Sequence, residues 1–271
     1  MALTLYERDI QRELETWQRG DESLARRLLD MAMTPVDWVT EKAVSPEALD
    51  QFDAGVEKFF SGLGEASNWT VSQSRILSDA RAFGIDADKL EQLRTCDMKK
   101  ADALARSMFK QNVVLAAVEG GGAGLGGVFM LTADLPLLFT INLRLIQQVT
   151  CAYGFDVSSE EFQPLVLAIF NAAASGTPAA RHQALREVTV AASGLVHGHP
   201  YTGRVSGTFM AQNRHIPREI AKSLLSRKLA QLVPIAGAAV GAGVNYWFTT
   251  QTAETAFMLA RALHIECKDR G

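Results

Sequence analysis

The chain has 271 residues, with 27 Lys and Arg against 30 Asp and Glu, which gives a formal net charge of −3. This balance excludes a protein that binds nucleic acid through a strong overall excess of basic residues, and the length allows one large domain or two smaller ones. Hydrophobic residues make up 48% of the sequence, which is high for a soluble protein and too low for one with many membrane spans.

Amphipathic helices separated by capping residues are predicted for the first hundred residues. The apolar positions of the first helix recur at helical spacing among charges: Leu5, Ile10, Leu14 and Trp17. Further helices are expected around 24–31 and 47–60, then one after Ser67 that ends at Gly84, and one that Asp86 caps. Since no stretch alternates with the period of two that a strand requires, we expect an all-α fold.

An apolar segment with a cluster of glycines follows. Between Gln111 and Phe155 only three residues are charged. We expect a helical hairpin here, in which a glycine-rich helix ends near Leu131, Asp134 caps the next helix with Pro136 in its first turn, and Gly154 ends that helix. Residues 162–174 then predict another apolar helix.

A second glycine-rich apolar region covers residues 229–253, which carry no charge. We expect it to form a second hairpin with the basic segment that starts near Pro217, and to end near Leu263. Its purely apolar part, residues 232–244, gives only about 20 Å of helix, whereas a membrane core is about 30 Å thick. Because Asp134 also interrupts the first region, membrane spanning is disfavoured, and a buried or shallowly inserted hairpin fits better.

Glycines four residues apart let helices approach closely. This spacing occurs once in each apolar region, at Gly122 with Gly126 and at Gly237 with Gly241. Packing within a helical core and packing within a membrane both explain it. No phosphate-binding motif accompanies these glycines, which do not follow a strand.

The order of these motifs resembles that of the EcsC family. The match consists of the glycine-rich segment 116–127, the turn 133–136, the helix that closes in Tyr153-Gly154-Phe155-Asp156, and the Pro-Gly-Asn segment 233–245. It covers about residues 65–265. The resemblance implies a bacterial protein associated with the cytoplasmic membrane, because the family is named after a protein encoded beside an ABC transporter. It carries over no catalytic residue set.

These observations predict a compact multi-helix bundle with two glycine-rich apolar helical hairpins packed at its centre. Residues 1–64 would form an N-terminal group of amphipathic helices, and residues 65–271 the EcsC-like helical domain.

A polar cluster between the two hairpins is the candidate site. Its members would be Asp134, Asn142, Arg144, Asn245 and Glu254. Helix capping explains Asp134 better than a catalytic role does, and a structural Asp–Arg pair in the core would explain the same residues. The pair of histidines at His197 and His199 has no further ligand nearby, so a loop explains it better than a metal site.

The three cysteines Cys96, Cys151 and Cys267 are scattered and have no metal-site spacing, which indicates a reducing compartment. The N-terminus is charged by Glu7 and lacks the apolar core of a secretory signal. We therefore expect a cytoplasmic protein, with no cofactor and no metal.

A local excess of basic residues adjoins the second apolar region. Between residues 200 and 230 six Lys and Arg face only Glu219, and the helical part of this stretch contains Arg214, Arg218, Lys222, Arg227 and Lys228. A solvated helix face explains it, as does attraction to anionic lipid headgroups. We expect a membrane-associated accessory or scaffold protein, peripheral to the inner membrane, that binds anionic membrane surfaces and no nucleic acid. A membrane protein is a further candidate partner. The alternatives are a hydrolase or lipid-modifying enzyme that uses the polar cluster, and a soluble carrier of an apolar ligand.

Overall fold

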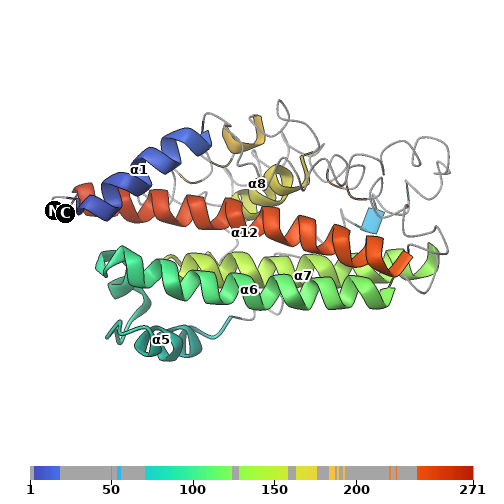
Figure 1. Cartoon of the computed structure of the whole chain (residues 1–271), viewed down its shortest axis with the longest axis horizontal. Coiled ribbons are helices and arrows are strands. Elements are labelled where there is room, and N and C mark those ends of the chain that lie inside the picture. The colour runs from blue at the N-terminus through green and yellow to red at the C-terminus, as the bar shows by residue number, and fades with distance from the viewer. Residues whose placement is uncertain are drawn as a thin grey trace.

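Helices make up the fold, in agreement with the all-α prediction (Figure 1). The computed structural model describes residues 3–18, 50, 54–55, 71–123, 128–157, 163–175, 183–186, 188, 192, 220, 224 and 237–270. The elements are α1 (Leu5–Gln18), α5 (Gln73–Ala82), the 3₁₀ turn η3 (Leu90–Thr95), α6 (Met98–Ala123), α7 (Val128–Ala152), α8 (Gln163–Ala174) and α12 (Gly237–Arg270). No strand occurs in these parts of the chain.

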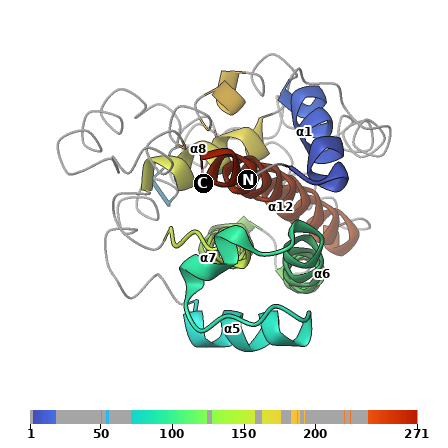
Figure 2. The same ribbon diagram turned by 90° about the vertical axis from the view of Figure 1, so that its left-hand side faces the viewer.

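Three long helices form the body of the molecule. Figure 2 shows α12 at the centre, the α6–α7 hairpin against one side of it with α5 beyond, and α8 and α1 on the opposite side. The most extensive helix contact joins α6 and α12. Contacts between Asp102 and Arg261 and between Arg106 and Phe257 show that these two helices are antiparallel. α7 therefore runs parallel to α12, since α6 and α7 form a hairpin.

Aromatic rings fix α7, α8 and α12 together. Phe139 lies edge-on to Phe170 of α8 and Phe248 of α12, with ring centroids 5.5 and 6.0 Å apart, and Phe170 and Phe248 are 5.8 Å apart. All three side chains are fully buried. Edge-on packing places the positive edge of one ring against the negative face of another, which adds to the gain from burial.

The turn of the first hairpin lies earlier than the sequence predicts. α6 ends at Ala123 and α7 begins at Val128, so Leu131 and Asp134 both lie inside α7. The prediction that Asp134 caps a helix is therefore wrong. Pro136 is interior to α7, where it lacks the N–H that would pair with the carbonyl group of residue 132. The helix tolerates this loss because Leu138, Phe139 and the residues beyond them are buried against the other helices.

The described part of the second apolar region, residues 237–253, belongs to one continuous helix. α12 carries Gly237 and Gly241 in its first turns and continues to Arg270, beyond the predicted end near Leu263. The proposed partner arm of that hairpin lies almost wholly outside the described residues. Among the helices of the described part, none combines the length and apolarity that crossing a membrane would require.

The starts of α5 and α6 differ from the sequence prediction. Ser72 caps α5 through a hydrogen bond from the backbone N–H of Arg75, while Ser67 lies outside the described residues. Asp86 lies in the coil before η3 and caps no helix. Asp97 takes that role for α6, because its Oδ1 accepts from the N–H of Lys99, 2.9 Å away.

Two glycines end helices, as predicted. Gly84 and Gly154 have positive φ angles, +72° and +84°. At Gly154 the backbone N–H of Phe155 donates to the carbonyl oxygen of Thr150 and that of Gly154 to Cys151, the pattern of a Schellman motif. A Cβ at Gly154 would also lie 2.8 Å from the carbonyl oxygen of Leu90, so this position requires glycine for two separate reasons.

Alanine substitutions at three glycines should therefore give graded changes in stability. Gly154→Ala combines the strain of a positive φ with a backbone clash, and we expect it to lower the free energy of unfolding by roughly 2–4 kcal/mol. Gly84→Ala meets only the flexible end of Lys100 and should cost less, about 1–2 kcal/mol. Gly55→Ala is the control, since nothing lies within 4 Å of a Cβ at this helical position. It should be neutral or stabilising. Urea unfolding measures the series, and equal losses at Gly154 and Gly55 would contradict this account.

Candidate functional site

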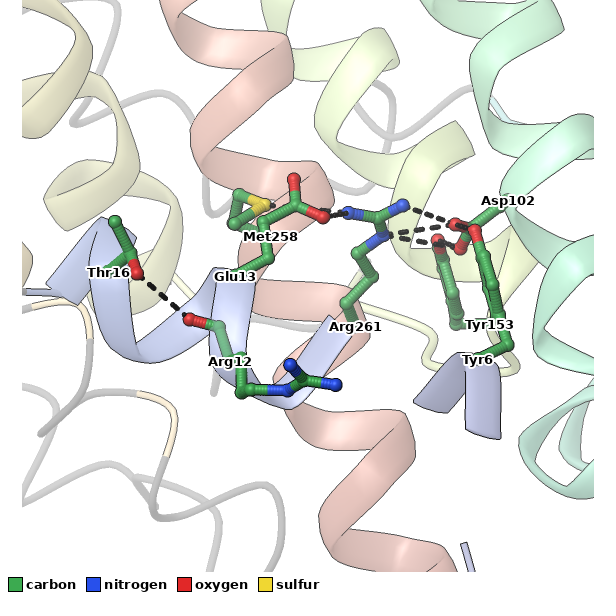
Figure 3. Close-up of polar contacts among 8 residues, drawn as sticks. All are labelled: Tyr6, Arg12, Glu13, Thr16, Asp102, Tyr153, Met258 and Arg261. Carbon is green, nitrogen blue, oxygen red and sulfur yellow. Dashed lines mark hydrogen bonds and ion pairs between the residues drawn. The ribbon is translucent and has the colours of Figure 1, made fainter. Parts of the chain in front are cut away.

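A buried carboxylate joins four parts of the chain. Asp102 of α6 accepts hydrogen bonds from the hydroxyl groups of Tyr6 in α1 and Tyr153 at the end of α7 (Figure 3). The distance between the oxygen atoms is 2.5 Å in both. Asp102 also accepts from Nε of Arg261 in α12, 3.1 Å away, and from one terminal nitrogen of the same guanidinium group. We call these residues, together with Glu13, the Asp102 cluster.

Arg261 is the positive centre of the Asp102 cluster, with a side chain only 1% exposed. One side of its guanidinium group contacts Asp102, and the other contacts Oε2 of Glu13, 3.1 Å away. Its plane lies over the ring of Phe257, 4.1 Å from the ring centroid. Burial alone would lower the pKa of Arg261, but the hydrogen bonds and charge of Asp102 raise it, so the guanidinium group stays charged.

The two phenols stay protonated. Burial, followed by the hydrogen bond to Asp102, raises the pKa of Tyr6 to about 12. The same causes raise the pKa of Tyr153 well above its ordinary value. Because two phenols and the guanidinium group occupy both oxygens of Asp102, the carboxylate has no free position from which to take a proton from a substrate. The Asp102 cluster therefore has a structural role, since it connects α1, α6, the end of α7 and α12.

A buried imidazole lies beside this cluster. His264 of α12 is fully buried and packs edge-on against Tyr153, with ring centroids 5.8 Å apart. Burial and the nearby charge of Lys268 lower its pKa to about 4, although Glu7, Asp102 and the backbone of Cys96 favour the charged form. Neither ring nitrogen makes a hydrogen bond of good geometry. His264 is therefore neutral at physiological pH.

The structure places the predicted polar residues on different faces. Asn142 of α7 and Asn245 of α12 are both fully buried. Nδ2 of Asn142 donates to Oγ1 of Thr249, 3.1 Å away, and Thr249 lies one turn from Asn245. Arg144 is exposed, because two residues correspond to a rotation of 200° about a helix. Nine positions separate Glu254 from Asn245, and a rotation of 100° for each residue places the two on opposite sides of α12.

Several other candidates are not tested. The side chain of Asp134 lies outside the described residues, as do Gly126, His197, His199 and the basic residues of the stretch 214–228. Close packing at Gly122, Gly237 and Gly241 stays a prediction, because nothing describes what surrounds them. Within the described parts of the chain, no group of three or more His, Cys, Asp or Glu residues could hold a metal ion.

The sequence analysis did not identify the Asp102 cluster. A local signal was present, since Arg261 interrupts the run of small and apolar residues 256–263, and Asp102 lies between Ala101 and Ala103. A charge at a buried helical position requires a partner. The partner could not be chosen, however, because 159 residues separate the two.

Comparisons with known proteins agree with the resemblance to the EcsC family that the sequence motifs indicate. The family model described as the EcsC protein family matches residues 8–263, which include most of α1. The uncharacterized protein YdbA of Bacillus subtilis (strain 168) is 25% identical over 178 residues, 66% of this chain and 63% of that protein. Protein EcsC of the same organism is 30% identical over 169 residues, 59% of this chain and 61% of that protein. The chain thus spans somewhat less than two thirds of each relative. No solved structure matches it.

Removing the central carboxylate should destabilise the fold strongly. Asp102→Ala leaves a buried guanidinium group and two phenols without their acceptor, and we expect a loss of about 3–5 kcal/mol in the free energy of unfolding. Asp88→Ala is the matched control, because its ion pair with Arg81 is solvent-exposed, with side chains 86% and 54% exposed. That loss should stay below about 1 kcal/mol. Chemical denaturation compares the two, and similar losses would show that the cluster contributes no special stability.

Acid should destabilise the protein through His264. Its folded pKa of about 4 lies below the ordinary value of 6.5, so the unfolded chain binds the proton more tightly. Stability is full above pH 6.5 and falls as the pH drops toward 4, by up to about 3 kcal/mol. Glu7 also has a lowered pKa, but a carboxylate acts at lower pH, so the slope between pH 6.5 and 5 belongs to His264. His264→Gln should flatten this slope in urea titrations. An unchanged slope would assign it to other groups.

Proposed function

This chain belongs to the EcsC protein family, and we propose that it is a peripheral membrane protein that serves as an accessory or scaffold. The observation that carries the proposal is the distribution of exposed large apolar side chains. Leu5 lies near the N-terminus, and the others lie in the half of the bundle away from the two chain ends: Val114, Leu115, Val118, Leu137 and Tyr246.

Four of these side chains belong to the α6–α7 hairpin. Val114 and Val118 lie one turn apart on α6 and are 63% and 67% exposed, and Leu137 on α7 is 43% exposed. Large apolar residues at this level of exposure, gathered in one region, are typical of a contact surface for a membrane or another protein. In Figure 1 the end of α6 and the start of α7 lie at the end of the bundle opposite the N and C labels.

Basic side chains border the apolar residues and favour a membrane as the partner. Lys110 lies one turn from Val114 on the same side of α6, and Arg144 lies two turns from Leu137 on α7; both are exposed. A helix that lies in the membrane interface buries apolar residues to about 5–10 Å, while lysine and arginine reach the headgroups. The basic stretch 214–228 would add further attraction to anionic lipids, at about 1 kcal/mol for each charge near the surface.

The pairing of the buried charges with one another favours an accessory role over catalysis. Arg261 contacts both Asp102 and the half-exposed Glu13, and Glu7 contacts Lys268, so the buried members of these pairs are satisfied within the fold. A catalytic acid or base needs access to a substrate proton. We therefore place the activity on the surface, at the cytoplasmic face of the membrane.

Vesicle flotation tests this proposal. Wild-type protein should bind anionic vesicles better than neutral ones, and binding should weaken with salt as the Debye length falls from about 10 Å at 0.1 M to about 3 Å at 1 M. Val114→Gln with Val118→Gln should weaken binding severalfold at every salt concentration. Charge reversal at Arg218, Lys222, Arg227 and Lys228 should remove the salt-dependent part.

Ala103→Gln is the control for these variants, because it changes an exposed position on the same helix at the far end of the bundle. It should bind like wild type. Wild-type protein that stays unbound to anionic vesicles at low salt would contradict the membrane proposal, and a tightly held apolar ligand found by mass spectrometry would then favour a carrier.

A further inference from the structure

The outer face of α6 carries basic and apolar side chains and no exposed acid. Figure 2 shows this helix at the edge of the bundle. Between Met98 and Val118 the only acidic residue is Asp102, which is buried and paired with Arg261. Six exposed residues recur at helical spacing within an arc of about 120° on an ideal helix, and we call them the α6 stripe: Lys99, Ala103, Arg106, Lys110, Val114 and Val118.

The exposed charges of α1, by contrast, are of both signs. α1 exposes Arg8 and Arg12 together with Asp9, Glu13 and Glu15, and Arg12 pairs with Asp9 on its surface. Mixed signs of this kind are ordinary for a helix face in water. The α6 stripe keeps one sign of charge over about five turns of helix. This uniform sign indicates a partner of negative charge.

Charge and apolarity follow one another along the α6 stripe. The basic residues occupy its first part, whereas Val114 and Val118, 63% and 67% exposed, occupy its last part. A helix that lies in a membrane interface buries its apolar residues to about 5–10 Å. Its lysine and arginine side chains extend to the headgroups from the same helix. The α6 stripe therefore fits the surface of an anionic bilayer, with the second half of α6 deeper than the first.

Aromatic rings hold two of these cations in place without neutralising them. The guanidinium carbon of Arg106 lies 4.9 Å from the ring centroid of Phe257 in α12, and Nζ of Lys99 lies 5.2 Å from that of Tyr6 in α1. A ring face attracts a cation but carries no net charge. Both cations therefore remain available to an anion, and they lose less freedom when they bind one.

From this order of residues we infer that α6 is the helix that contacts the membrane, and that it lies nearly in the plane of an anionic bilayer. Arg106 and Lys110 contact the phosphate groups of lipid headgroups, while Val114 and Val118 enter the boundary of the acyl chains. The bundle therefore rests on its side. The inference rests on the proposed membrane function and deepens it, since it assigns the contact helix, its orientation and the lipid group that is bound.

Entry of the bundle end-on is disfavoured. The connection between α6 and α7 lies at the end that would enter first, and Glu119 on α6 and Asp134 on α7 flank it. An ionised carboxylate is costly in the apolar layer. Twelve residues, about 18 Å of helix, also separate Arg106 from Val118. An end-on helix that buried Val118 would hold Arg106 away from the headgroups, whereas a helix in the plane uses both parts of the α6 stripe.

Depth measurements test the orientation. The fluorophore NBD is attached to single cysteines at Val118→Cys, Ala103→Cys or Gln11→Cys, in the full chain with its three native cysteines replaced by alanine. Gln11 is an exposed control position on α1. With vesicles of phosphatidylglycerol and phosphatidylcholine, we expect nitroxide in the upper acyl chain to quench the label at Val118. Headgroup nitroxide should quench the label at Ala103, and neither should quench the label at Gln11.

The pattern of quenching separates this inference from the proposed function. A quenched label at Val118 with an unquenched one at Ala103 would indicate end-on entry and overturn the inference alone. Equal quenching at Ala103 and Gln11 would also overturn it, because α6 would then have no special place at the bilayer. Wild-type protein that stays unbound overturns both. Dimers in light scattering, with the label at Val118 shielded before vesicles are added, would assign the α6 stripe to a second copy.

Charge variants test the contact with headgroups. Arg106→Glu with Lys110→Glu should weaken binding at least about tenfold at 0.1 M salt, measured by flotation. Arg8→Glu with Arg75→Glu is the matched control, because it changes the net charge equally at exposed positions of α1 and α5. Its loss should be about twofold or less, since charges beyond a Debye length of about 10 Å are screened. Equal losses in the two variants would overturn the inference.

Circular dichroism shows whether the reversed chain is folded. If it is not, Arg106→Gln with Lys110→Gln removes the two charges without reversing them. This variant should still weaken binding by about threefold or more, and unchanged binding would count against the inference.

Discussion

The paired charges of Asp102 and Arg261 are the constraint on which the arrangement of the helices depends. Removing two charges from water costs several kcal/mol for each ion, and mutual attraction offsets this only when hydrogen bonds satisfy the remaining positions. The fold meets this condition by bringing Tyr6 and Tyr153 to Asp102, and Glu13 and Phe257 to Arg261. These partners come from α1, from the end of α7 and from α12 itself, so satisfying the pair requires that these three parts of the chain meet at α6.

The two ends of the bundle consequently differ in chemistry. At the end with the chain termini, charged and polar groups are buried and paired, and Gly154 packs tightly against the backbone of η3. Toward the other end, α6 and α7 expose valine and leucine, and the charges are few. A protein that needed only stability would bury its apolar residues and expose its charges. The exceptions to this pattern, buried charges at one end and exposed apolar residues toward the other, favour a molecule whose first end holds the helices together and whose other end makes contacts.

Short sequence patterns correctly predicted the elements that depend on residues close together in the chain. The helical spacing of Leu5, Ile10 and Leu14 gave α1 its correct position, and Gly154 ended α7 because a Schellman motif needs positive φ. The same kind of signal failed at Asp134, where Asp before Leu and Pro is typical of a helix start but burial of the following residues extends the helix past it. The predicted polar cluster stays a prediction, because the side chain of Asp134 lies outside the described residues. Helical geometry alone places Asn142 and Arg144, two positions apart, on different faces of α7, whereas the pairing of Asp102 with Arg261 depends on the completed fold.

The large separation between Asp102 and Arg261 also sets an order of events during synthesis. Asp102 leaves the ribosome 159 residues before its partner, and at 5–20 residues per second that interval is roughly 8–30 s. During this time the α6–α7 hairpin can form from neighbouring segments, but its central carboxylate has no counterion. The nascent chain therefore passes through a stage in which the site around Asp102 is open, and α12 closes it once that helix has been made.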